Sequence, residues 1–393
     1  MHKKINVLVL NVPFHEGMAG TKRVKNLLLP LYEREEIDLS NLVLTEIFEK
    51  DRIGENGSIN GIDYLYIGYT SFKNILSVND YFKKGRQFIK QHSKPESKNI
   101  IYCFAYPDLK NLVFILYAKL IKYKIIFDIV EDHRHTHYFF GLAGKIKNKS
   151  SLYLLKLVPL FGDGLIVISN HLEKWCNSMF SNKIKVHNIP ITINIKEIDK
   201  KKNEVSEIID EVIIFYGGSF APKDGLEYLL QAFKHLCNKY NNIRLVLTGE
   251  GQGIYMEKMI ELIKANPKID YRGFISTPEY YAVLQSSDIC CMTRTNSLFA
   301  NTGFPFKLGE FLAAGKAIIA TNVGDVPLYL ENGINALVIS PESVDTIEEA
   351  LSIFIENKNE IRETLGIAAK KTAKQYFDDS ILSEKLLDIF KNL

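Results

Sequence analysis

Short, uninterrupted apolar segments alternate along this chain with longer amphipathic segments. Strands with apolar side chains on both faces are typical of sheets that helices cover on both sides. Strand–helix units that repeat in this way build doubly wound parallel sheets. With 393 residues, the chain has room for two domains of about 150–200 residues each. The sequence therefore predicts an α/β fold with two doubly wound parallel sheets, one in each half.

The predicted strands fall into two groups, separated by a charged stretch. In the first half we expect strands at residues 6–10, 64–68, 100–104, 125–129 and 164–168. In the second half we expect them at 212–216, 244–247, 289–292, 317–320 and 336–339. Residues 195–211 are charged and show no strand pattern before Val212. We therefore place the domain boundary there, with domains over residues 1–195 and 196–375.

Charge, cysteine content and hydropathy narrow the classes of function. Lys and Arg number 49 against 46 Asp and Glu, and a net charge of only +3 is not the footprint of a nucleic-acid-binding protein. The five cysteines form no CxxC pair, which is typical of reduced thiols in a cytosolic protein. The most apolar stretches are interrupted by Lys, Pro, Gly or Asp, so none predicts a membrane-spanning helix. We expect a cytoplasmic protein that binds no nucleic acid.

A glycine-rich loop follows the first strand of the second half. The segment Tyr216-Gly-Gly-Ser-Phe-Ala-Pro-Lys-Asp-Gly225 leads directly into a predicted helix. Glycines at such a turn let backbone N–H groups approach a phosphate, and the helix N-terminus favours negative charge. Lys223 adds a positive charge beside it. The loop is either an anion site or an ordinary turn between a strand and a helix.

The segment from Asn301 to Thr321 places a carboxylate within an apolar helix. Glu310 is followed by Phe311 and two further apolar residues, where an ionised group is costly unless it is paired or bonded to a ligand. Lys307 lies three residues earlier, so both side chains can share a helix face. The two residues either form an ion pair or divide a ligand's phosphate and hydroxyl groups between them.

The segment Gly-Phe-Pro-Phe-Lys-Leu-Gly-Glu-Phe-Leu-Ala-Ala-Gly-Lys-Ala-Ile-Ile-Ala-Thr321 resembles the donor-site signature of family 4 glycosyltransferases of the GT-B fold. Neighbouring stretches are similar to that family in the same order: the glycine loop, Leu247-Thr-Gly-Glu-Gly-Gln-Gly253, Tyr271-Arg-Gly-Phe274 and Asn322-Val-Gly-Asp-Val-Pro327. The match covers about residues 212–340 and is looser in the first half. The ordered set is much more specific than any single motif.

The resemblance implies a GT-B fold with two Rossmann-like domains facing a cleft. It implies an N-terminal acceptor-binding domain, a C-terminal domain for a nucleotide-sugar donor, and a last helix over residues 376–393 that packs back on the first domain. It also implies glycosyl transfer with retention of configuration and no metal or other cofactor. We expect a UDP-sugar, with a GDP-sugar as the alternative, and a saccharide or lipid-linked acceptor in surface polysaccharide synthesis.

The same resemblance implies roles for individual residues. Glu310 would hold the donor ribose hydroxyls, and the two loop glycines would let the backbone approach the phosphates. Without a metal, cations must meet the negative charge that develops on the departing diphosphate; Lys223 is the first candidate, with Lys307 and Arg294 next. The full set of expected donor-site positions is Gly217, Gly218, Ser219, Glu250, Phe274, Arg294, Thr302 and Glu310.

Three positions depart from the family pattern. Thr302 stands where the family often has a Glu that contacts the donor sugar. Ser219 stands where it often has Arg, and Asp224 where it has Lys, with Lys223 one place earlier. The diphosphate clamp is therefore either shifted or built from other residues. These departures keep open a catalytically inactive accessory protein of the same fold; a sugar-nucleotide epimerase is the other alternative.

In the first half, two loops follow predicted strands. The loop from Phe14 to Arg23 resembles the family's acceptor-side loop, with Gly17 and Gly20 as its candidate residues, or is an ordinary turn. Asp132 and His133 match the place where the family often carries a group that faces the acceptor. They would orient a hydroxyl or accept its proton, or else only bond within the loop. His133, His135 and His137 stand at alternate positions of this segment. No fourth ligand is evident beside them, and we expect no metal there.

Residues 142–158 are basic and then apolar. A basic amphipathic helix can dock on anionic lipid, which would suit a lipid-linked acceptor and peripheral contact with the inner face of a membrane. Alternatively, its apolar side chains only pack on the sheet.

Overall fold

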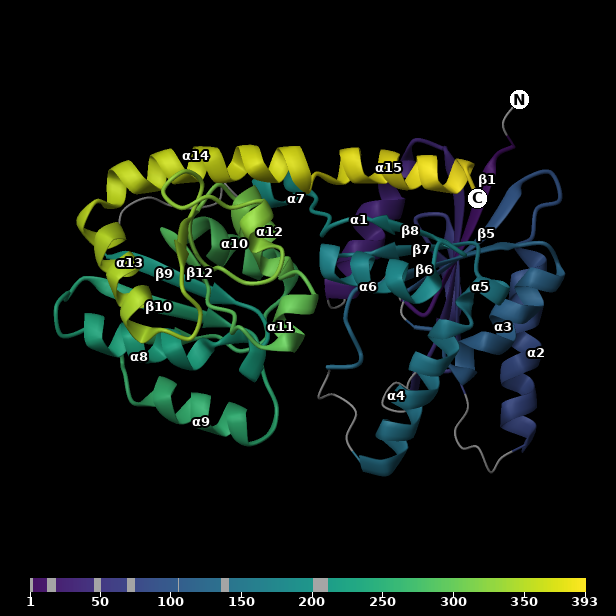
Figure 1. The fold of residues 1–393 in the computed structure, drawn as a ribbon, viewed down its shortest axis with the longest axis horizontal. Helices are drawn as coiled ribbons and strands as arrows, with labels where there is room; N and C mark the ends of the chain where they lie inside the picture. Colours follow the sequence, from purple (N-terminus) through teal and green to yellow (C-terminus); the bar gives the residue numbers. More distant parts are fainter. Residues whose placement is uncertain are drawn as a thin grey trace. The chain divides into compact units, whose positions relative to one another are not determined.

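In the computed structural model, the chain divides into two compact units, each built on its own sheet (Figure 1). Unit 1 comprises Met1–Pro190 and Asp379–Leu393, and unit 2 comprises Ile191–Asp378; the sequence analysis placed these boundaries at residues 195 and 375. The structure describes residues 3–12, 19–45, 51–68, 75–104, 106–135, 141–200 and 211–393. The prediction of two doubly wound parallel sheets is confirmed.

The sheet of unit 1 has the strand order β3-β4-β2-β1-β5-β6-β7-β8 over the described ranges. All neighbours pair in parallel except β3, which is antiparallel to β4 at the edge. The strands are β1 (Ile5–Leu10), β2 (Ile37–Leu44), β3 (Asn56–Ile59), β4 (Ile62–Ile67), β5 (Lys98–Phe104), β6 (Lys124–Ile129), β7 (Gly164–Val167) and β8 (Lys185–Asn188). Its helices are α1 (Ala19–Glu33), α2 (Ile75–Gln91), α3 (Leu109–Leu120), α4 (Gly141–Lys156), α5 (Val158–Phe161), α6 (Asn170–Phe180) and α15 (Asp379–Lys391).

Helices cover both faces of this sheet, as continuous apolar strands require. On one face α15 packs against α1, and Leu386 and Phe390 of α15 join the core formed with β1 and β5. Right-handed crossovers between β5, β6 and β7 place α3 and α5 on the opposite face, where Phe161 packs edge-on against Phe127 of β6. The last helix of the chain therefore completes the core of unit 1.

The sheet of unit 2 is parallel throughout, with the order β11-β10-β9-β12-β13-β14. Its strands are β9 (Val212–Gly217), β10 (Ile243–Thr248), β11 (Ile269–Tyr271), β12 (Ile289–Met292), β13 (Ala317–Thr321) and β14 (Leu337–Ile339). Its helices are α7 (Ile195–Lys200), α8 (Leu226–Leu236), α9 (Gly253–Lys264), α10 (Thr277–Ser286), α11 (Leu298–Thr302), α12 (Phe306–Ala313), α13 (Val344–Glu356) and α14 (Lys358–Tyr376), with the 3₁₀ turns η3 (Pro222–Asp224) and η4 (Val326–Leu328). The order reverses between β9 and β12, and ligands of such sheets bind at the carboxyl ends of the strands beside this switch point.

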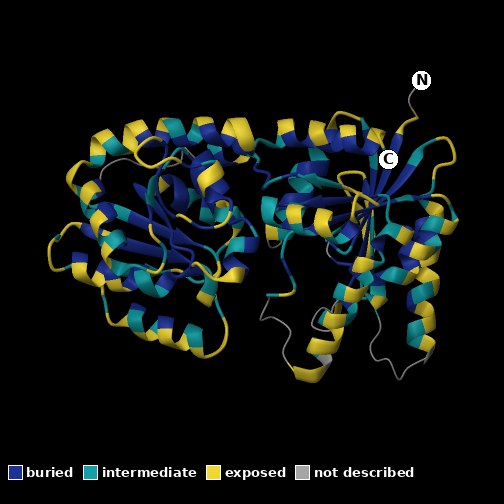
Figure 2. Ribbon diagram, viewed as in Figure 1, coloured by how far each residue is buried: buried dark blue, intermediate teal, exposed yellow. Residues whose placement is uncertain are grey.

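Burial follows the predicted strands closely (Figure 2). Every residue of β1, β12 and β13 is buried. Besides the exposed edge strand β3, the sequence analysis did not predict three strands: β2, β8 and β11. Polar residues interrupt β2, where Ser40 and Asn41 are nonetheless buried, while β8 and β11 are short and contain no buried residue. Tertiary pairing, and not local apolar pattern, makes these segments strands.

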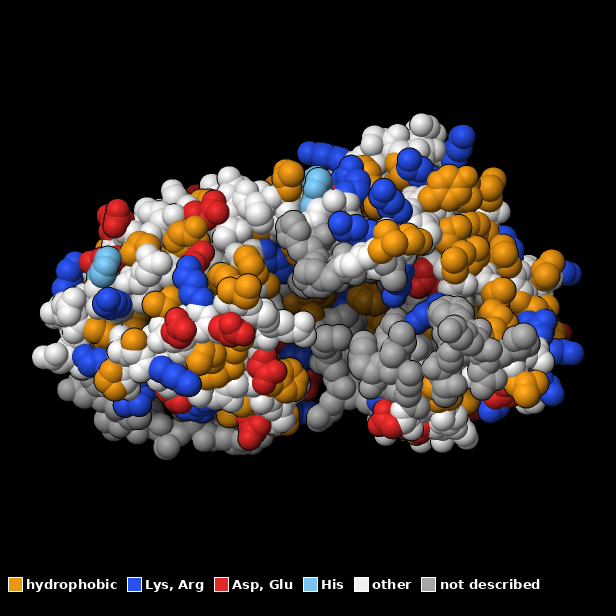
Figure 3. Space-filling view, turned by 90° about the horizontal axis from the view of Figure 1, so that it is seen from below, with side chains coloured by type: hydrophobic (Ala, Val, Ile, Leu, Met, Phe, Trp, Pro, Cys, Tyr) orange, Lys and Arg blue, Asp and Glu red, His pale blue; other side chains and the backbone are white. Residues whose placement is uncertain are grey.

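The surface differs between the units. On the face seen in Figure 3, acidic and basic side chains are interspersed over unit 2, whereas hydrophobic side chains gather with Lys and Arg on unit 1. In the described part of the chain, no helix combines the length and the apolar character needed to cross a bilayer.

A fully buried ion pair ties α1 of unit 1 to its sheet. Arg23 Nε lies 2.8 Å from Asp128 Oδ2, and both side chains have 0% exposure. Burial lowers the pKa of Arg23, but the Asp128 carboxylate more than reverses this and the net shift is upward. The guanidinium also donates to the carbonyl oxygens of Ile189 and Pro190, and Tyr102 donates to the carboxylate. One charge pair thus connects β5, β6, α1 and the end of the first segment of unit 1.

We expect Asp128→Leu to lower the free energy of unfolding by about 3–5 kcal/mol, because the Arg23 charge would stay buried without its partner. Urea unfolding followed by the fluorescence of the single tryptophan, Trp175, in unit 1 measures the effect. The control is Lys84→Met, which breaks the exposed pair with Asp80 and should change this free energy by less than about 0.5 kcal/mol. The double variant Arg23→Met/Asp128→Leu should cost less than Asp128→Leu alone; an equal or larger cost would contradict the argument.

Candidate functional site

The candidate site of unit 2 lies where the strand order reverses. The glycine loop continues from the carboxyl end of β9 into η3 and α8, and Thr293-Arg-Thr295 continues from the end of β12. The backbone N–H of Thr295 donates to the Lys223 carbonyl oxygen at 2.9 Å, and the Thr293 hydroxyl donates to the Asp224 carbonyl oxygen at 3.2 Å. Hydrogen bonds between the two loops therefore hold this end of the sheet together.

Two glycines allow the loop to take this course. Gly225 ends η3 with φ of 63°, and a Cβ there would lie 2.0 Å from the Thr293 carbonyl oxygen. Gly218 has φ of 140°, and a Cβ there would lie 2.7 Å from Cε of Lys307. At Gly225 both the conformation and the Thr293 backbone exclude a side chain, whereas at Gly218 the positive φ disfavours one and the end of the Lys307 side chain would have to move.

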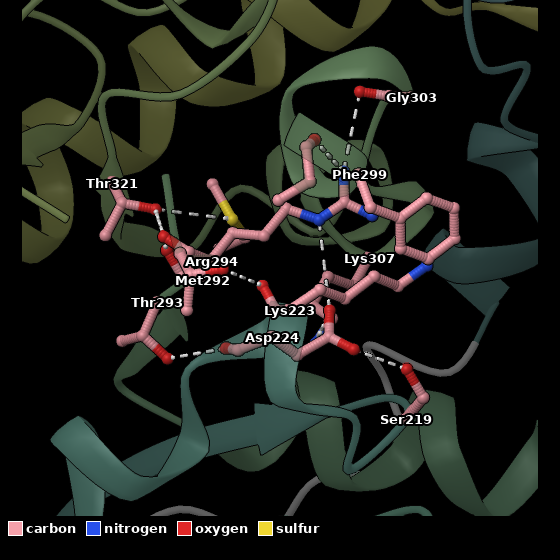
Figure 4. A network of polar contacts seen from close by, with 12 residues as sticks. Ser219, Lys223, Asp224, Met292, Thr293, Arg294, Phe299, Gly303, Lys307 and Thr321 are labelled. Carbon is pink, nitrogen blue, oxygen red and sulfur yellow. Dashed lines mark hydrogen bonds and ion pairs between the residues drawn. The ribbon is translucent and has the colours of Figure 1, made fainter. Parts of the chain in front are cut away.

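Asp224 is the centre of a buried polar cluster (Figure 4). Its carboxylate accepts a 2.5 Å hydrogen bond from Ser219 and lies 3.7 Å from Lys307 Nζ and 3.9 Å from Arg294 Nε. Burial raises the pKa of this carboxyl, but the charges of Lys307, Arg294 and Lys223 outweigh it and the net shift is downward. The carboxylate therefore stays ionised beside two close cations, Lys307 and Arg294, and the charge of Lys223 adds to their effect.

The three cations come from different parts of unit 2. Lys307 is the second residue of α12, and its Nζ lies 3.9 Å from the centre of the Tyr216 ring. Lys223 belongs to η3, and its Nζ lies 4.3 Å from the Phe299 ring. Arg294 follows β12 and donates through Nη1 to the Ala300 carbonyl oxygen. Among the described residues, the buried Nε of Arg294 has no hydrogen-bond partner.

The ammonium group of Lys307 loses its proton at a pH not far above neutral. Burial lowers its pKa to about 8; Asp224 favours the charged form, while Arg294 and Lys223 oppose it. With all four groups ionised, three cations face one carboxylate, so the cluster has a net charge of +2. Such a cluster beside a glycine loop is suited to an anion that carries two negative charges.

Glu310 is buried on α12, with an exposed fraction of 8%. The Tyr281 hydroxyl donates to its Oε1 at 3.5 Å. Burial raises the pKa of both Tyr280 and Tyr281, and the neighbouring Glu310 carboxylate adds to this rise. Two tyrosines of α10 therefore hold the carboxylate in place from one side. The sequence analysis gave no role to either tyrosine.

The remaining donor-site predictions are placed as follows. Gly217 is buried, and a Cβ there would lie 2.5 Å from the Tyr280 ring. Thr302 is buried and donates to the Phe299 carbonyl oxygen at 3.1 Å. Glu250 is exposed at the end of β10, although its carbonyl oxygen accepts from the N–H of Phe220 in the glycine loop. Phe274 is 74% exposed. The structure thus brings Ser219, Lys223, Arg294 and Lys307 together.

Asp224 was noted in the sequence only as a departure from a family pattern, yet it is the centre of this cluster. Its neighbour Lys223 and the following glycine gave no sign that an acid would be buried there. The only available signal was an acidic residue in a turn that leads into an apolar helix, and this does not distinguish a surface carboxylate from a buried one.

In unit 1, Asp132 and His133 follow β6, as predicted. The fully buried Asp132 carboxylate accepts hydrogen bonds from the backbone and side chain of Arg134, and it lies 3.4 Å from His171 Nε2. Burial raises the pKa of this carboxyl, but the bonds from Arg134 outweigh it and the net shift is downward. His133 stacks on Tyr106 with ring centres 3.9 Å apart, and burial lowers its pKa to about 4. At neutral pH, His133 is therefore an uncharged imidazole beside a carboxylate.

Of the other residues predicted for unit 1, some are placed by the structure and others lie outside the described residues. Gly20 lies in the first turn of α1, where a Cβ would approach the Phe104 ring to 2.7 Å. Gly17, and His137 of the histidine run, lie outside the described residues. Within the described ranges, no cluster of three or more His, Cys, Asp or Glu side chains is arranged to hold a metal ion; the expectation of metal-independent chemistry remains a prediction.

Comparison with known proteins finds glycosyltransferases. Residues 196–372 match the family "Glycosyl transferases group 1". The chain is 24% identical over 270 residues to an uncharacterised glycosyltransferase of Methanocaldococcus jannaschii, covering 66% of this chain and 67% of that protein. It is 23% identical over 254 residues to the capsular polysaccharide biosynthesis glycosyltransferase CapM of Staphylococcus aureus, covering 61% and 64%. The matches thus span about two thirds of the length of these relatives.

A solved structure of Anabaena HepE in complex with UDP-glucose superposes with a TM-score of 0.69. The alignment covers 99% of this chain and 100% of HepE at 14% sequence identity. At this identity the likeness establishes the shared GT-B fold and leaves the choice of substrate to the residues of the site.

We expect Gly225→Ala to lower the free energy of unfolding by about 3 kcal/mol or more, because the new methyl group would collide with the Thr293 carbonyl oxygen. The matched control is Gly253→Ala, where φ is 66° and nothing lies within 4 Å of a Cβ. That change should cost only the roughly 1–2 kcal/mol of a left-handed residue. Urea unfolding followed by circular dichroism compares them, and equal costs would show that the close approach at Gly225 is relieved by a small shift.

Proposed function

This chain belongs to the glycosyl transferase group 1 family and is a glycosyltransferase that uses nucleotide sugars, and we propose that it transfers a sugar from a UDP-sugar with retention of configuration. The acceptor is a saccharide or a lipid-linked saccharide. The observation that carries this proposal is the cluster of Lys223, Arg294 and Lys307 around Asp224 at the switch point of unit 2.

The charge of the cluster matches the demand of the reaction. The bond between the anomeric carbon and the diphosphate oxygen breaks, and its electron pair stays on the departing UDP. The acceptor hydroxyl forms the new bond on the same face of the sugar and gives up its proton to the departing phosphate oxygen. Since negative charge grows on the diphosphate, preorganised cations stabilise this transition state. Lys223 is our candidate for contact with the leaving oxygen, with Lys307 and Arg294 beside it.

Asp224 acts in this scheme as a positioning residue. Three cations without a carboxylate would repel one another in a buried site, and Asp224 lies within 4 Å of two of them. Ser219 fixes the orientation of the carboxylate. Ser219 and Asp224 stand where the family pattern often has Arg and Lys, so in this scheme the positive charge comes from Lys223, Arg294 and Lys307.

Donor recognition rests on Glu310 and the glycines. A buried carboxylate held by tyrosines can accept hydrogen bonds from the two ribose hydroxyls, which offsets its desolvation. Gly218 lies directly against the end of the Lys307 side chain, so a phosphate at this part of the backbone would also meet the lysine ammonium group. The UDP-glucose complex of the structural neighbour HepE supports a uridine nucleotide as the donor.

The acceptor side is assigned to unit 1. Neutral His133 and ionised Asp132 lie together after β6, and they would orient the acceptor hydroxyl. The name of the relative CapM supports a role in surface polysaccharide synthesis. A lipid-linked acceptor would place the enzyme at the inner face of a membrane.

A catalytically inactive accessory protein is the alternative that specific observations favour. The Thr302 hydroxyl donates to the Phe299 carbonyl oxygen. Ser219 stands where the family often has Arg. Such a protein would still bind UDP but would release no UDP from a UDP-sugar, so turnover separates it from an enzyme.

We expect the protein to bind UDP more tightly than GDP or CMP in calorimetric titrations, and Glu310→Gln to weaken UDP binding by about tenfold to a hundredfold. The loss corresponds to about 1.5–3 kcal/mol for hydrogen bonds to a charged group. The control, Glu349→Gln, changes an exposed carboxylate on α13 and should bind as the wild type does. Unchanged binding by Glu310→Gln would remove Glu310 from the donor site.

We expect UDP affinity to fall about tenfold between pH 7 and pH 9, because Lys307 loses its proton above a pKa of about 8 and bound diphosphate favours the charged form. Below pH 8 the lysine is already charged, so affinity should level off as the pH falls. Lys307→Met should bind weakly without this step, and Lys307→Arg should keep its affinity to higher pH. The same pH step in Lys307→Met would assign the titration to another group.

A further inference from the structure

Helix α3 of unit 1 presents an apolar stripe that the core does not use. One face of the helix packs inward and includes Phe114 and Ile115. The opposite face carries four residues that are between 38% and 81% exposed, at the spacing of one helical face: Leu109, Val113, Leu116 and Leu120. A helix that needs only one apolar face to fold is therefore apolar on two.

Helix α4 has a second stripe of the same kind. Leu142, Ile146 and Tyr153 share one face and are between 59% and 77% exposed. Leu160 of α5 is 77% exposed, and α5 contacts both α3 and α4. The crossover rule places these three helices on the same face of the sheet. The two stripes therefore belong to one side of unit 1, where Figure 3 shows hydrophobic side chains gathered with Lys and Arg.

The charge of these helices has a single sign. Residues 109–127 and 133–162 contain no Asp or Glu, although acidic and basic residues are nearly balanced in the whole chain. Helix α4 alone carries Lys145, Lys147, Lys149 and Lys156, and all four are exposed. On a soluble surface an exposed apolar stripe of this size is unusual, and the charged side chains of these three helices are all basic. Asp163, which follows α5, pairs with Lys119 of α3 and with Lys124.

We propose that α3, α4 and α5 form a surface that docks unit 1 on a bilayer of anionic phospholipid. The leucine, isoleucine and tyrosine side chains enter the interface between headgroups and acyl chains, while the lysines reach the phosphates. A second copy of the chain would oppose lysines to lysines, and a nucleic acid would leave the leucines in water. The proposal goes beyond the glycosyl transfer and needs neither donor nor acceptor.

Vesicle co-sedimentation of the full chain tests this surface. The vesicles are phosphatidylcholine with and without phosphatidylglycerol, at low and high salt. We expect binding only with phosphatidylglycerol, weakened by salt because lysines at a charged surface are screened. Lys145→Gln/Lys149→Gln should weaken binding about fivefold for each lysine removed. Leu142→Gln/Ile146→Gln and Leu116→Gln/Leu120→Gln should each weaken it about tenfold or more.

Matched controls lie on unit 2. Ile254→Gln/Ile367→Gln removes apolar side chains that are 84% and 67% exposed, and Lys371→Gln/Lys374→Gln removes exposed lysines of α14; both should bind vesicles as the wild type does. Unchanged far-ultraviolet circular dichroism and an unchanged urea midpoint show that each variant is folded, and neither measurement depends on the proposed reaction. Equal binding to neutral vesicles, or equal losses in the controls, would overturn the proposal. A dimer in sedimentation velocity that Leu116→Gln/Leu120→Gln dissociates, without vesicle binding, would assign the surface to a second copy.

Discussion

The buried carboxylate of Asp224 is the interaction on which the proposed donor site depends. Three cations converge at the carboxyl ends of β9 and β12, and without a counter-charge the nearly buried Lys307 and Arg294 would repel each other strongly. The carboxylate is itself held by Ser219 and by the turn that ends at Gly225. Loop, helix α12 and the end of β12 are therefore positioned by one ionised group, and the excess positive charge is left for a ligand.

Unit 1 also contains a buried cluster of charged groups, but there the charges balance. Arg23 and Asp128 are fully buried and satisfy each other, together with backbone carbonyl groups and Tyr102. No charge is left over, so this pair stabilises the unit and offers nothing to a ligand. In unit 2 the cations outnumber the carboxylate. We take this imbalance, and not burial by itself, as the ground for proposing that the cluster of unit 2 binds an anion.

Much of the fold could be predicted from local pattern, because buried parallel strands have no polar face to interrupt them. Strands β9, β12 and β13 begin where the apolar segments begin. Strand β2 could not be predicted in this way, since Asp38, Ser40 and Asn41 break its apolar run and only its neighbours β1 and β4 make it a strand. In the site, Lys223, Lys307 and Glu310 were identified from their loops and helix, whereas Asp224, Tyr280 and Tyr281 gave no comparable signal.

The sequence by itself determined the α/β class, the two sheets and the glycine loop, since these follow from apolar period, turn residues and motif order along the chain. Tertiary structure alone decided that Asp224 pairs with residues seventy and more positions away, because the distance between two side chains in a parallel sheet depends on which strands become neighbours. It also decided which apolar residues of α3 and α4 remain exposed. The helical spacing of apolar residues predicts that an apolar face exists. Only the packed unit shows whether other residues cover that face.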